Sequence, residues 1–218
     1  DIIFERLLNS LLLTFTAICL ALVLAIPLGI LAALKPGSII DRVTVVFSLF
    51  FLSLPQFWLG LLLILLFAVE LHWLPTSGFR GISSIILPAL TLALPAMTRL
   101  VLIARSSMID ELNQQYVKTV KAKGMPFFRM VAIHAFRNGA IAVTTLAGWE
   151  LVEALAGTII VETVFAWPGL GHTTMQAIAK RDLVLLQAIV LTITFLVVVA
   201  NVLIDILHKA IDPRVRLA

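Results

Sequence analysis

Apolar residues run through this chain in long stretches, which short polar turns interrupt. Five stretches are long enough to cross a bilayer as helices, since a spanning helix needs about 20 apolar residues. The predicted spans are residues 7–34, 43–71, 85–102, 141–164 and 183–207. The second span exceeds the required length and contains Pro55, so we expect a tilt or a kink. The third contains Pro88 and Pro95 and should be short and kinked.

The longest polar passage is residues 116–138, reading YVKTVKAKGMPFFRMVAIHAFRN. Gly124 and Pro126 interrupt it, because glycine suits a helix C-terminus and proline cannot continue a helix. A second short helix should begin at Phe127, so the pattern predicts a helix, a glycine turn and a helix between two spans. The first helix is amphipathic, because apolar residues recur every fourth position. These residues are Met108, Leu112, Tyr116 and Val120.

The lysines of this passage, Lys118, Lys121 and Lys123, lie mostly off the apolar stripe. One interpretation is a cytoplasmic loop whose lysines meet anionic lipid headgroups. The other is a helical knob that inserts into a groove of a soluble partner. We favour the knob, because other parts of the chain agree with it.

Composition places the chain in a membrane. Hydrophobic residues make up 61% of the 218 and charged residues 13%, and the mean hydropathy is +1.10. A soluble domain of this size needs more charge on its surface. The apolar runs are also longer than barrel strands of about ten residues. We therefore predict an all-α integral membrane protein, with residues 1–218 as one transmembrane domain. Cys19 is the only cysteine, so there is no disulfide framework.

The basic residues indicate the orientation. The net charge of +4 raises the possibility of nucleic-acid binding, but the basic residues cluster at span ends, so we reject that interpretation. Cytoplasmic loops carry an excess of lysine and arginine. The first loop, the third loop and the tail, with their flanks, carry 12 of the 16: Lys35, Arg42, Arg99, Arg105, Lys118, Lys121, Lys123, Arg129, Arg137, Lys209, Arg214 and Arg216. The 116–138 passage and the C-terminus should therefore be cytoplasmic, and the AWPGLG loop (residues 166–171) and Asp1 should lie outside.

Four passages resemble one family. They are SLPQFWLG (53–60), HWLPTSG (72–78), YVKTVKAKG with HAFRN (116–138) and VETVFAWPGLG (161–171). Together they resemble permease subunits of the dipeptide, oligopeptide and nickel ABC importers, over essentially the whole chain. Lys118, Thr119 and Val120 replace the Glu-Ala-Ala of the general importer motif, as in the peptide and nickel variant. The resemblance implies the type I importer permease fold of six helices, so we expect a first helix and an extracellular segment to be missing before Asp1.

The resemblance also implies partners. These are a second homologous permease that forms a heterodimer with this chain, two cytoplasmic ATPase subunits, and an extracytoplasmic solute-binding protein. The chain has no G-x-x-x-x-G-K-S/T loop. We therefore expect no enzyme activity and no cofactor of its own, with ATP and Mg on the ATPase subunits. Membrane lipid is a further partner, and the location is a bacterial or archaeal cytoplasmic membrane. The substrate is a small peptide, nickel (free or chelated), or another small solute.

Two groups of candidate residues follow from the resemblance. The loop at 107–138 should couple to the ATPase subunits, and its candidate residues are Tyr116, Lys118, Thr119, Val120, Ala122, Lys123, Gly124, Phe127, Phe128, Arg137 and Asn138. The outer loop should face the binding protein, through Ala166, Trp167, Pro168, Gly169 and Gly171. Trp167 alone is also compatible with an ordinary interfacial anchor.

Two acidic residues lie inside the fourth span. Glu150 and Glu153 are three residues apart and so share one helical face. They either line the translocation pathway, where they would suit a divalent cation or a peptide amino terminus, or form a structural pair with a base such as Arg99. We assign no resident metal site. Glu162, at the end of this span, is predicted to be structural.

Two other classes of protein compete with the importer. An ion-gradient transporter normally shows internal repeats with paired broken helices, and the sequence shows none. An intramembrane enzyme needs a nucleophile and a base, or metal ligands, on facing spans. The histidines lie in loops or near span ends and form no such arrangement.

Overall fold

The computed structural model describes residues 2–211, and the side chains of all of these except residues 134, 156, 208, 210 and 211. The described chain is helical and contains no strand. The predicted exit tail, with Arg214 and Arg216, lies outside the described residues. The helices are α1 (Ile2–Leu34), α2 (Ile39–Ser53), α3 (Gln56–Leu63, continued by a π-helix at Ile64–Glu70), α4 (Ser83–Leu112), α5 (Gln115–Ala122), α6 (Phe127–Arg129, continued by a π-helix at Met130–Ala135), α7 (Phe136–Val164), α8 (Leu170–Lys180) and α9 (Leu183–Ile211).

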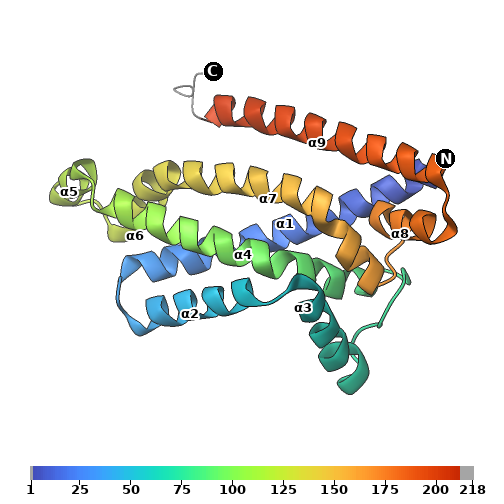
Figure 1. Ribbon diagram of the computed structural model, residues 1–218. Helices are drawn as coiled ribbons and strands as arrows, with labels where there is room; N and C mark the ends of the chain where they lie inside the picture. The colour runs from blue at the N-terminus through green and yellow to red at the C-terminus, as the bar shows by residue number, and fades with distance from the viewer. Residues whose placement is uncertain (1, 212–218) are drawn as a thin grey trace.

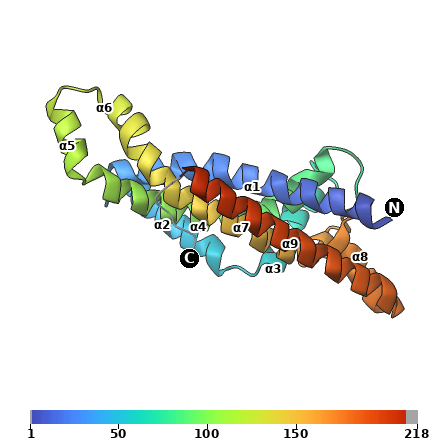
Figure 2. The same ribbon diagram turned by 90° about the horizontal axis from the view of Figure 1, so that it is seen from above.

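The long helices form one elongated bundle (Figures 1 and 2). Helix α4 packs mainly against α1 and α7, and α9 lies on the outside against α7 and α8. The α1–α2 turn and α5 lie at one end, whereas the start of α1 and α8 lie at the opposite end. The two ends correspond to the predicted cytoplasmic and outer sides, respectively.

Each predicted span coincides with a helix, or for the second with a bent pair of helices, although several bounds differ. Four single helices are long and apolar enough to cross a membrane, and α2 with α3 makes a fifth when the bent pair counts as one span. The two halves meet at 103°. Leu54 has an extended backbone (φ −83°, ψ 132°) because a residue that precedes proline avoids the helical region. The kink expected at Pro55 is therefore present.

The third span is longer than predicted. Helix α4 runs for 30 residues through both Pro88 and Pro95, so the expectation of a short span was wrong. Proline is tolerated within a membrane helix when neighbouring helices and hydroxyl side chains satisfy the backbone. The missing N–H groups of Pro88 and Pro95 leave the Ser84 and Thr91 carbonyls without their usual helical donors. Nearby hydroxyls bond other carbonyls of the helix: Thr91 Oγ1 donates to Leu87 at 2.8 Å, and Thr98 Oγ1 donates to Pro95 at 2.7 Å.

Small residues let α1 and α4 approach closely. A methyl group at Gly29 of α1 would lie 2.6 Å from the Ala104 Cβ of α4 and 3.0 Å from the Val101 carbonyl oxygen. Close backbone approach through small residues is a principal source of packing energy between membrane helices. The same interface buries a set of alanines: Ala17, Ala21, Ala25, Ala89, Ala93 and Ala96.

A buried ion pair fixes the inner end of this unit. Asp41, in the first turn of α2, accepts a bidentate hydrogen bond from the Nε and Nη2 of Arg105 in α4. It also accepts the Gly37 N–H at 2.7 Å, and its own N–H donates to the N-cap hydroxyl of Ser38. This pair was not predicted from the sequence. The pair ties the α1–α2 turn to α4.

Asp41→Asn should destabilise the protein. The amide keeps the volume of the side chain but leaves the Arg105 charge without its counter-ion, at a cost of roughly 2–4 kcal/mol for this partly buried arginine. The midpoint of thermal unfolding in detergent should fall by about 5–15 °C. Arg42→Gln, which removes an exposed charge one position further along, is the control and should leave the midpoint unchanged. Equal midpoints for both variants would contradict a stabilising role of the pair.

Candidate transport and coupling sites

The inner loop is built differently from the predicted pattern. Helix α4 ends at Leu112 and α5 begins at Gln115, so the stripe from Met108 to Val120 is divided between two helices rather than carried by one. The second helix is also not separate, because α6 continues through the π-helix into α7. The stripe residues still meet in one small core, since α5 packs against the π-helix at Met130–Ala135. Buried Met108, Val117, Met130, Val131 and Ala135 form that core, with Leu112, Tyr116 and Val120 packed against it.

Gly124 ends α5 as predicted. Its φ of +77° lies in the left-handed region, and a Cβ there would meet nothing within 4 Å. Glycine is therefore needed for its backbone conformation and not for space. Pro126 precedes the first helical residue Phe127, a position where its missing N–H costs nothing.

Tyr116 joins the two sides of the loop. Its hydroxyl donates to Glu111 Oε2 at 2.5 Å and accepts the Asn138 amide N–H at 3.1 Å. Burial raises the pKa of the Tyr116 phenol above its ordinary value, and the Glu111 carboxylate raises it further. The phenol therefore stays protonated and keeps donating. Two predicted coupling residues, 22 positions apart, are brought into direct contact here.

Most of the other predicted coupling residues are exposed at this end of the bundle. Phe128 is 84% exposed and Phe127 51% exposed, so this end of the bundle carries a large uncovered apolar surface. Their rings form an edge-to-face pair with centroids 6.4 Å apart. The exposed polar and small members are Lys118, Thr119, Ala122, Lys123, Gly124, Arg137 and Asn138. The loop thus presents an aromatic pair with basic neighbours on a helical projection (Figure 2).

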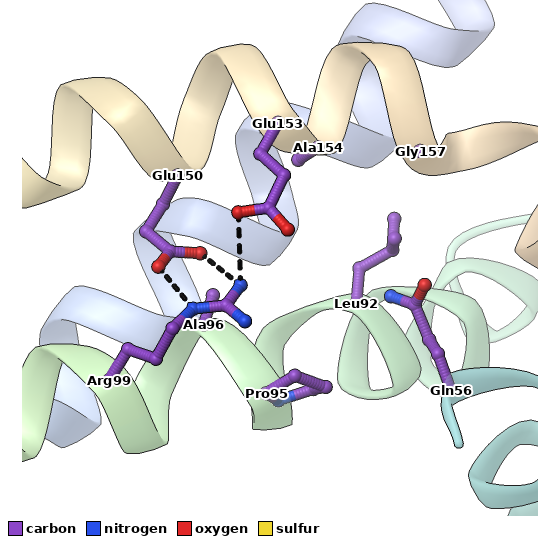
Figure 3. A pocket seen from close by; sticks show the side chains of 9 residues that line it. All are labelled: Gln56, Leu92, Pro95, Ala96, Arg99, Glu150, Glu153, Ala154 and Gly157. Atoms are coloured by element: carbon purple, nitrogen blue, oxygen red, sulfur yellow. Dashed lines mark hydrogen bonds and ion pairs between the residues drawn. The ribbon is translucent and has the colours of Figure 1, made fainter. Parts of the chain in front are cut away.

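The acidic pair of α7 faces an arginine of α4. Arg99 donates from Nε to Glu150 Oε1 at 2.5 Å and from Nη2 to Glu150 Oε2 at 2.6 Å. Nη2 also lies 3.4 Å from Glu153 Oε2. Figure 3 shows both glutamates pointing from α7 toward the guanidinium. The interpretation of a pair with Arg99 therefore describes the contacts, and it fits Glu150 better than Glu153. The side chain of Glu150 is 1% exposed and that of Glu153 is 53% exposed.

This triad lines a cavity of about 70 Å³. The cavity lies between α3, α4 and α7, and the break at Pro55 places Gln56 on its wall (Figure 3). Its lining residues are Gln56, Leu92, Pro95, Ala96, Arg99, Glu150, Glu153, Ala154 and Gly157. Across the described residues, no three His, Cys, Asp or Glu side chains come together as metal ligands.

In the outer loop, the position of Trp167 differs from the prediction. Trp167 was expected to be an exposed tip, but its side chain is completely buried. Its Nε1 donates to the Asn9 carbonyl of α1 at 3.1 Å, and its ring packs edge-to-face on Phe79 with centroids 5.1 Å apart. Asn9 in turn donates to the Pro168 carbonyl at 2.9 Å. The tryptophan therefore holds the loop against α1. Ala166 is exposed beside it.

Glu162 explains the glycines of the AWPGLG loop. This fully buried carboxylate accepts the Ser10 hydroxyl at 2.5 Å and the N–H groups of Gly171 and His172 at 2.7 and 3.1 Å. It thereby caps the start of α8, as predicted for a structural residue. A Cβ at Gly169 would lie 2.5 Å from the Glu162 Cδ, so this glycine leaves space for the carboxylate. Sequence reasoning missed Ser10, although the polar pair Asn9-Ser10 stands out in an apolar run.

The bundle is a known membrane-transporter fold. An inward-facing structure of the MetNI methionine ABC transporter matches it with a TM-score of 0.82 and 16% identity, over 97% of this chain and 96% of that one. An amino acid ABC transporter solved with histidines matches with a TM-score of 0.75 and 15% identity, over 96% and 94% of the two chains. These likenesses establish the fold class, including the predicted importer permease fold.

Sequence comparison then places the chain in a family. Residues 25–217 match the family of binding-protein-dependent transport system inner membrane components. The oligopeptide transport system permease protein AppB of Bacillus subtilis is 38% identical over 99% of this chain and 71% of its own length. The dipeptide transport system permease protein DppB of Escherichia coli K12 is 33% identical over 92% of this chain and 68% of its own. A putative peptide transport system permease of Brucella abortus is 36% identical over 97% and 70%.

The chain therefore belongs to the inner-membrane components of binding-protein-dependent transport systems, and it is a permease subunit of an ABC importer. The resemblance seen in the four sequence passages is confirmed. The ion-gradient transporter, the leading alternative, finds no support among these relatives. The residues assigned to coupling, to the pathway and to the outer loop remain predictions.

Gly171→Ala should loosen α8, because its Cβ would lie 2.9 Å from the Ile159 backbone nitrogen and 3.0 Å from Glu162 Oε2. We expect a loss of about 1–3 kcal/mol in unfolding free energy. Gly157→Ala is the matched control in the same region, since a Cβ there meets nothing within 4 Å. Thermal midpoints and hydrogen exchange of the α8 amides measure both variants. Unchanged exchange in Gly171→Ala would contradict the packing role.

Proposed function

We propose that this chain forms half of the translocation pathway of an ATP-driven importer of small peptides. The relatives named as oligopeptide and dipeptide permeases, similar over nearly the whole chain, support peptides as the substrate class. The structure adds an observation about how the loop and the cavity are connected. Helix α4 is continuous from Arg99, at the charged cavity, to Leu112, where the exposed inner loop begins. A displacement of the loop can therefore reach the cavity through a single helix.

The proposed partners follow from surfaces that this chain leaves uncovered. A second, homologous but different permease subunit would complete the pathway, because one chain encloses only about 70 Å³ around its charged groups. In the most apolar 18-residue stretch of α9, only 6% of the residues are buried. Most of this helix is therefore free for lipid or for the second subunit.

The inner loop is the proposed contact with two cytoplasmic ATPase subunits, which bind ATP and Mg. Exposed Phe127 and Phe128, beside Lys118, Lys123 and Arg137, suit a groove with an apolar floor and acidic edges. The hydrogen bond between Tyr116 and Asn138 links α5 to the start of α7 and so stabilises the loop. The distribution of lysine and arginine supports a cytoplasmic position for this loop and for the C-terminus.

The outer loop is the proposed contact with an extracytoplasmic solute-binding protein. Its exposed part is Ala166, together with the outward face of α8, and not Trp167. The contacts of Trp167, Pro168 and Glu162 keep that surface rigid, so little side-chain ordering would be needed on docking.

Reconstitution tests this function directly. The chain is co-expressed with its partner subunits, placed in proteoliposomes, and supplied with the binding protein and labelled dialanine. We expect uptake that requires ATP and the binding protein, and none from a proton or sodium gradient alone. Gradient-driven uptake by this chain alone would refute the importer, and uptake of nickel with no uptake of dialanine would refute the peptide assignment.

Gly124→Asp should abolish uptake. The substitution forces a side chain into a left-handed backbone at a cost of about 1 kcal/mol and adds an acidic charge among Lys121, Lys123 and Arg129. ATPase co-purification, ATP hydrolysis and uptake are measured on one preparation. Loss of co-purification means failed docking, whereas hydrolysis without uptake means uncoupling.

Gly37 provides a matched control for backbone strain. It has a φ of +78° in the other inner turn, and a Cβ there also meets nothing within 4 Å. Gly37→Ala and Gly124→Ala carry similar strain, so a larger loss of uptake in Gly124→Ala would report on coupling. Normal uptake by Gly124→Asp would instead make the loop a lipid-facing basic surface.

A further inference from the structure

The Arg99 triad is not fully satisfied by its own members. Within the described part of the chain, Arg99 Nη1 and Glu153 Oε1 have no hydrogen-bond partner. The remaining guanidinium nitrogen faces away from the two glutamates (Figure 3). One arginine and two glutamates leave a net charge of −1 on the cavity wall. An unbalanced charge at membrane depth is costly and marks a functional site.

The three side chains have different roles in this arrangement. Glu150 is buried and engages both of its oxygens with Arg99, so its charge is already paired. Arg99 is held by that bidentate contact in a fixed orientation. Glu153 is half exposed, and its one contact with Arg99 is long, at 3.4 Å. The excess negative charge is therefore centred on Glu153, the more exposed carboxylate of the cavity wall.

We propose that Glu153 binds the terminal ammonium group of a peptide as it passes, and that Arg99, fixed by Glu150, is a positioning residue that holds Glu153 over the cavity. The proposal rests on the peptide function proposed above and names the recognition step within it. The cavity has room for only a few molecules the size of water, each of which needs about 10–15 Å³ by this measure. It therefore fits an end group and not a whole dipeptide.

An ammonium group fits this site better than a divalent metal or a carboxylate. A divalent metal requires several oxygen or nitrogen ligands, and only one carboxylate is available here, because Arg99 occupies the other. A substrate carboxylate could accept a hydrogen bond from Arg99 Nη1, but the net negative charge of the triad would repel it. A primary ammonium can donate to Glu153 Oε1, and the Gln56 amide of α3 provides another acceptor that lines the same cavity.

Gly157 offers a reporter position for the charge of the cavity. It lies one helical turn after Glu153, lines the same cavity, and has open space around its missing Cβ. We would place Gly157→Cys in a Cys19→Ser background, since Cys19 is the only native thiol. The assembled transporter in nanodiscs is labelled with a trimethylammonium and a sulfonate methanethiosulfonate. Each rate is divided by the rate of the same reagent with a small thiol in solution.

The cationic reagent should react on the order of tenfold faster than the anionic one, because a unit charge within several ångströms acts on the two with opposite sign. Glu153→Gln should bring this ratio close to one. Glu5→Gln, which removes an equal charge at the outer end of α1, should leave the ratio unchanged. Millimolar dialanine should slow the labelling of Cys-substituted Gly157, and N-acetyl-dialanine should not.

Three results would overturn the proposal. They are a ratio that Glu153→Gln does not change, equal protection by dialanine and N-acetyl-dialanine, and no reaction of either reagent at position 157. Glu153→Gln must also retain its thermal midpoint and its ATPase partners, which a merely structural role would alter. Dialanine uptake by the unsubstituted transporter is measured alongside. If dialanine uptake occurs but labelling at position 157 shows no charge preference, only the ammonium site is refuted. If there is no dialanine uptake, the peptide function itself is refuted.

Discussion

Buried carboxylates must find partners in a membrane protein, and this constraint organises the bundle. Three carboxylates of the described chain are buried: Asp41 near the inner end, Glu150 in the middle and Glu162 near the outer end. Each one ties together helices that are distant in sequence. Asp41 joins α2 to α4, Glu150 joins α7 to α4, and Glu162 joins α7 to α1 and α8. Removing Arg99 or Arg105 would leave a buried carboxylate without its counter-ion, which costs far more than the pair contributes. Glu162 has neutral donors instead, so removing the Ser10 hydroxyl would cost one of its hydrogen bonds.

Helix α4 carries both arginines of this arrangement. Arg99 and Arg105 lie six residues apart, and each forms a bidentate pair with a different neighbouring helix. The close packing at Gly29 and the buried alanines fix α4 against α1 over the same length. Close-packed interfaces do not deform continuously, so α4 moves as a unit or stays in place. This rigidity is what makes it suitable for joining the inner loop to the charged cavity.

The sequence predicted local features well and long-range ones poorly. Hydropathy located the spans, Pro55 located the break, and Gly124 located a left-handed residue, because each depends on the residue itself and its neighbours. The burial of Trp167 was not predicted, because it depends on contacts with Asn9 and Phe79, which are distant in the chain. The division of the apolar stripe at Asn113 was also missed, although the backbone hydrogen bonds that end the helix there are local. The partner of Glu150 could be named as a candidate from residue type alone, whereas Arg105 as the partner of Asp41 could not.

The glycines of the inner turns and those of the AWPGLG loop have different structural roles. At the inner end, Gly37 and Gly124 have positive φ and open space, so they shape exposed turns that a partner can reach. In the AWPGLG loop, Gly169 and Gly171 have no positive φ and instead leave room for the Glu162 carboxylate and the Ile159 backbone, respectively. Gly78 and Gly81, in the loop before α4, resemble the inner pair in having positive φ and open space. Moving the outer loop would therefore expose a buried, multiply bonded carboxylate, whereas moving the inner loop disturbs mainly a small apolar core and the Tyr116 contacts. The inner loop is accordingly the element that a partner can displace at the lower cost in free energy.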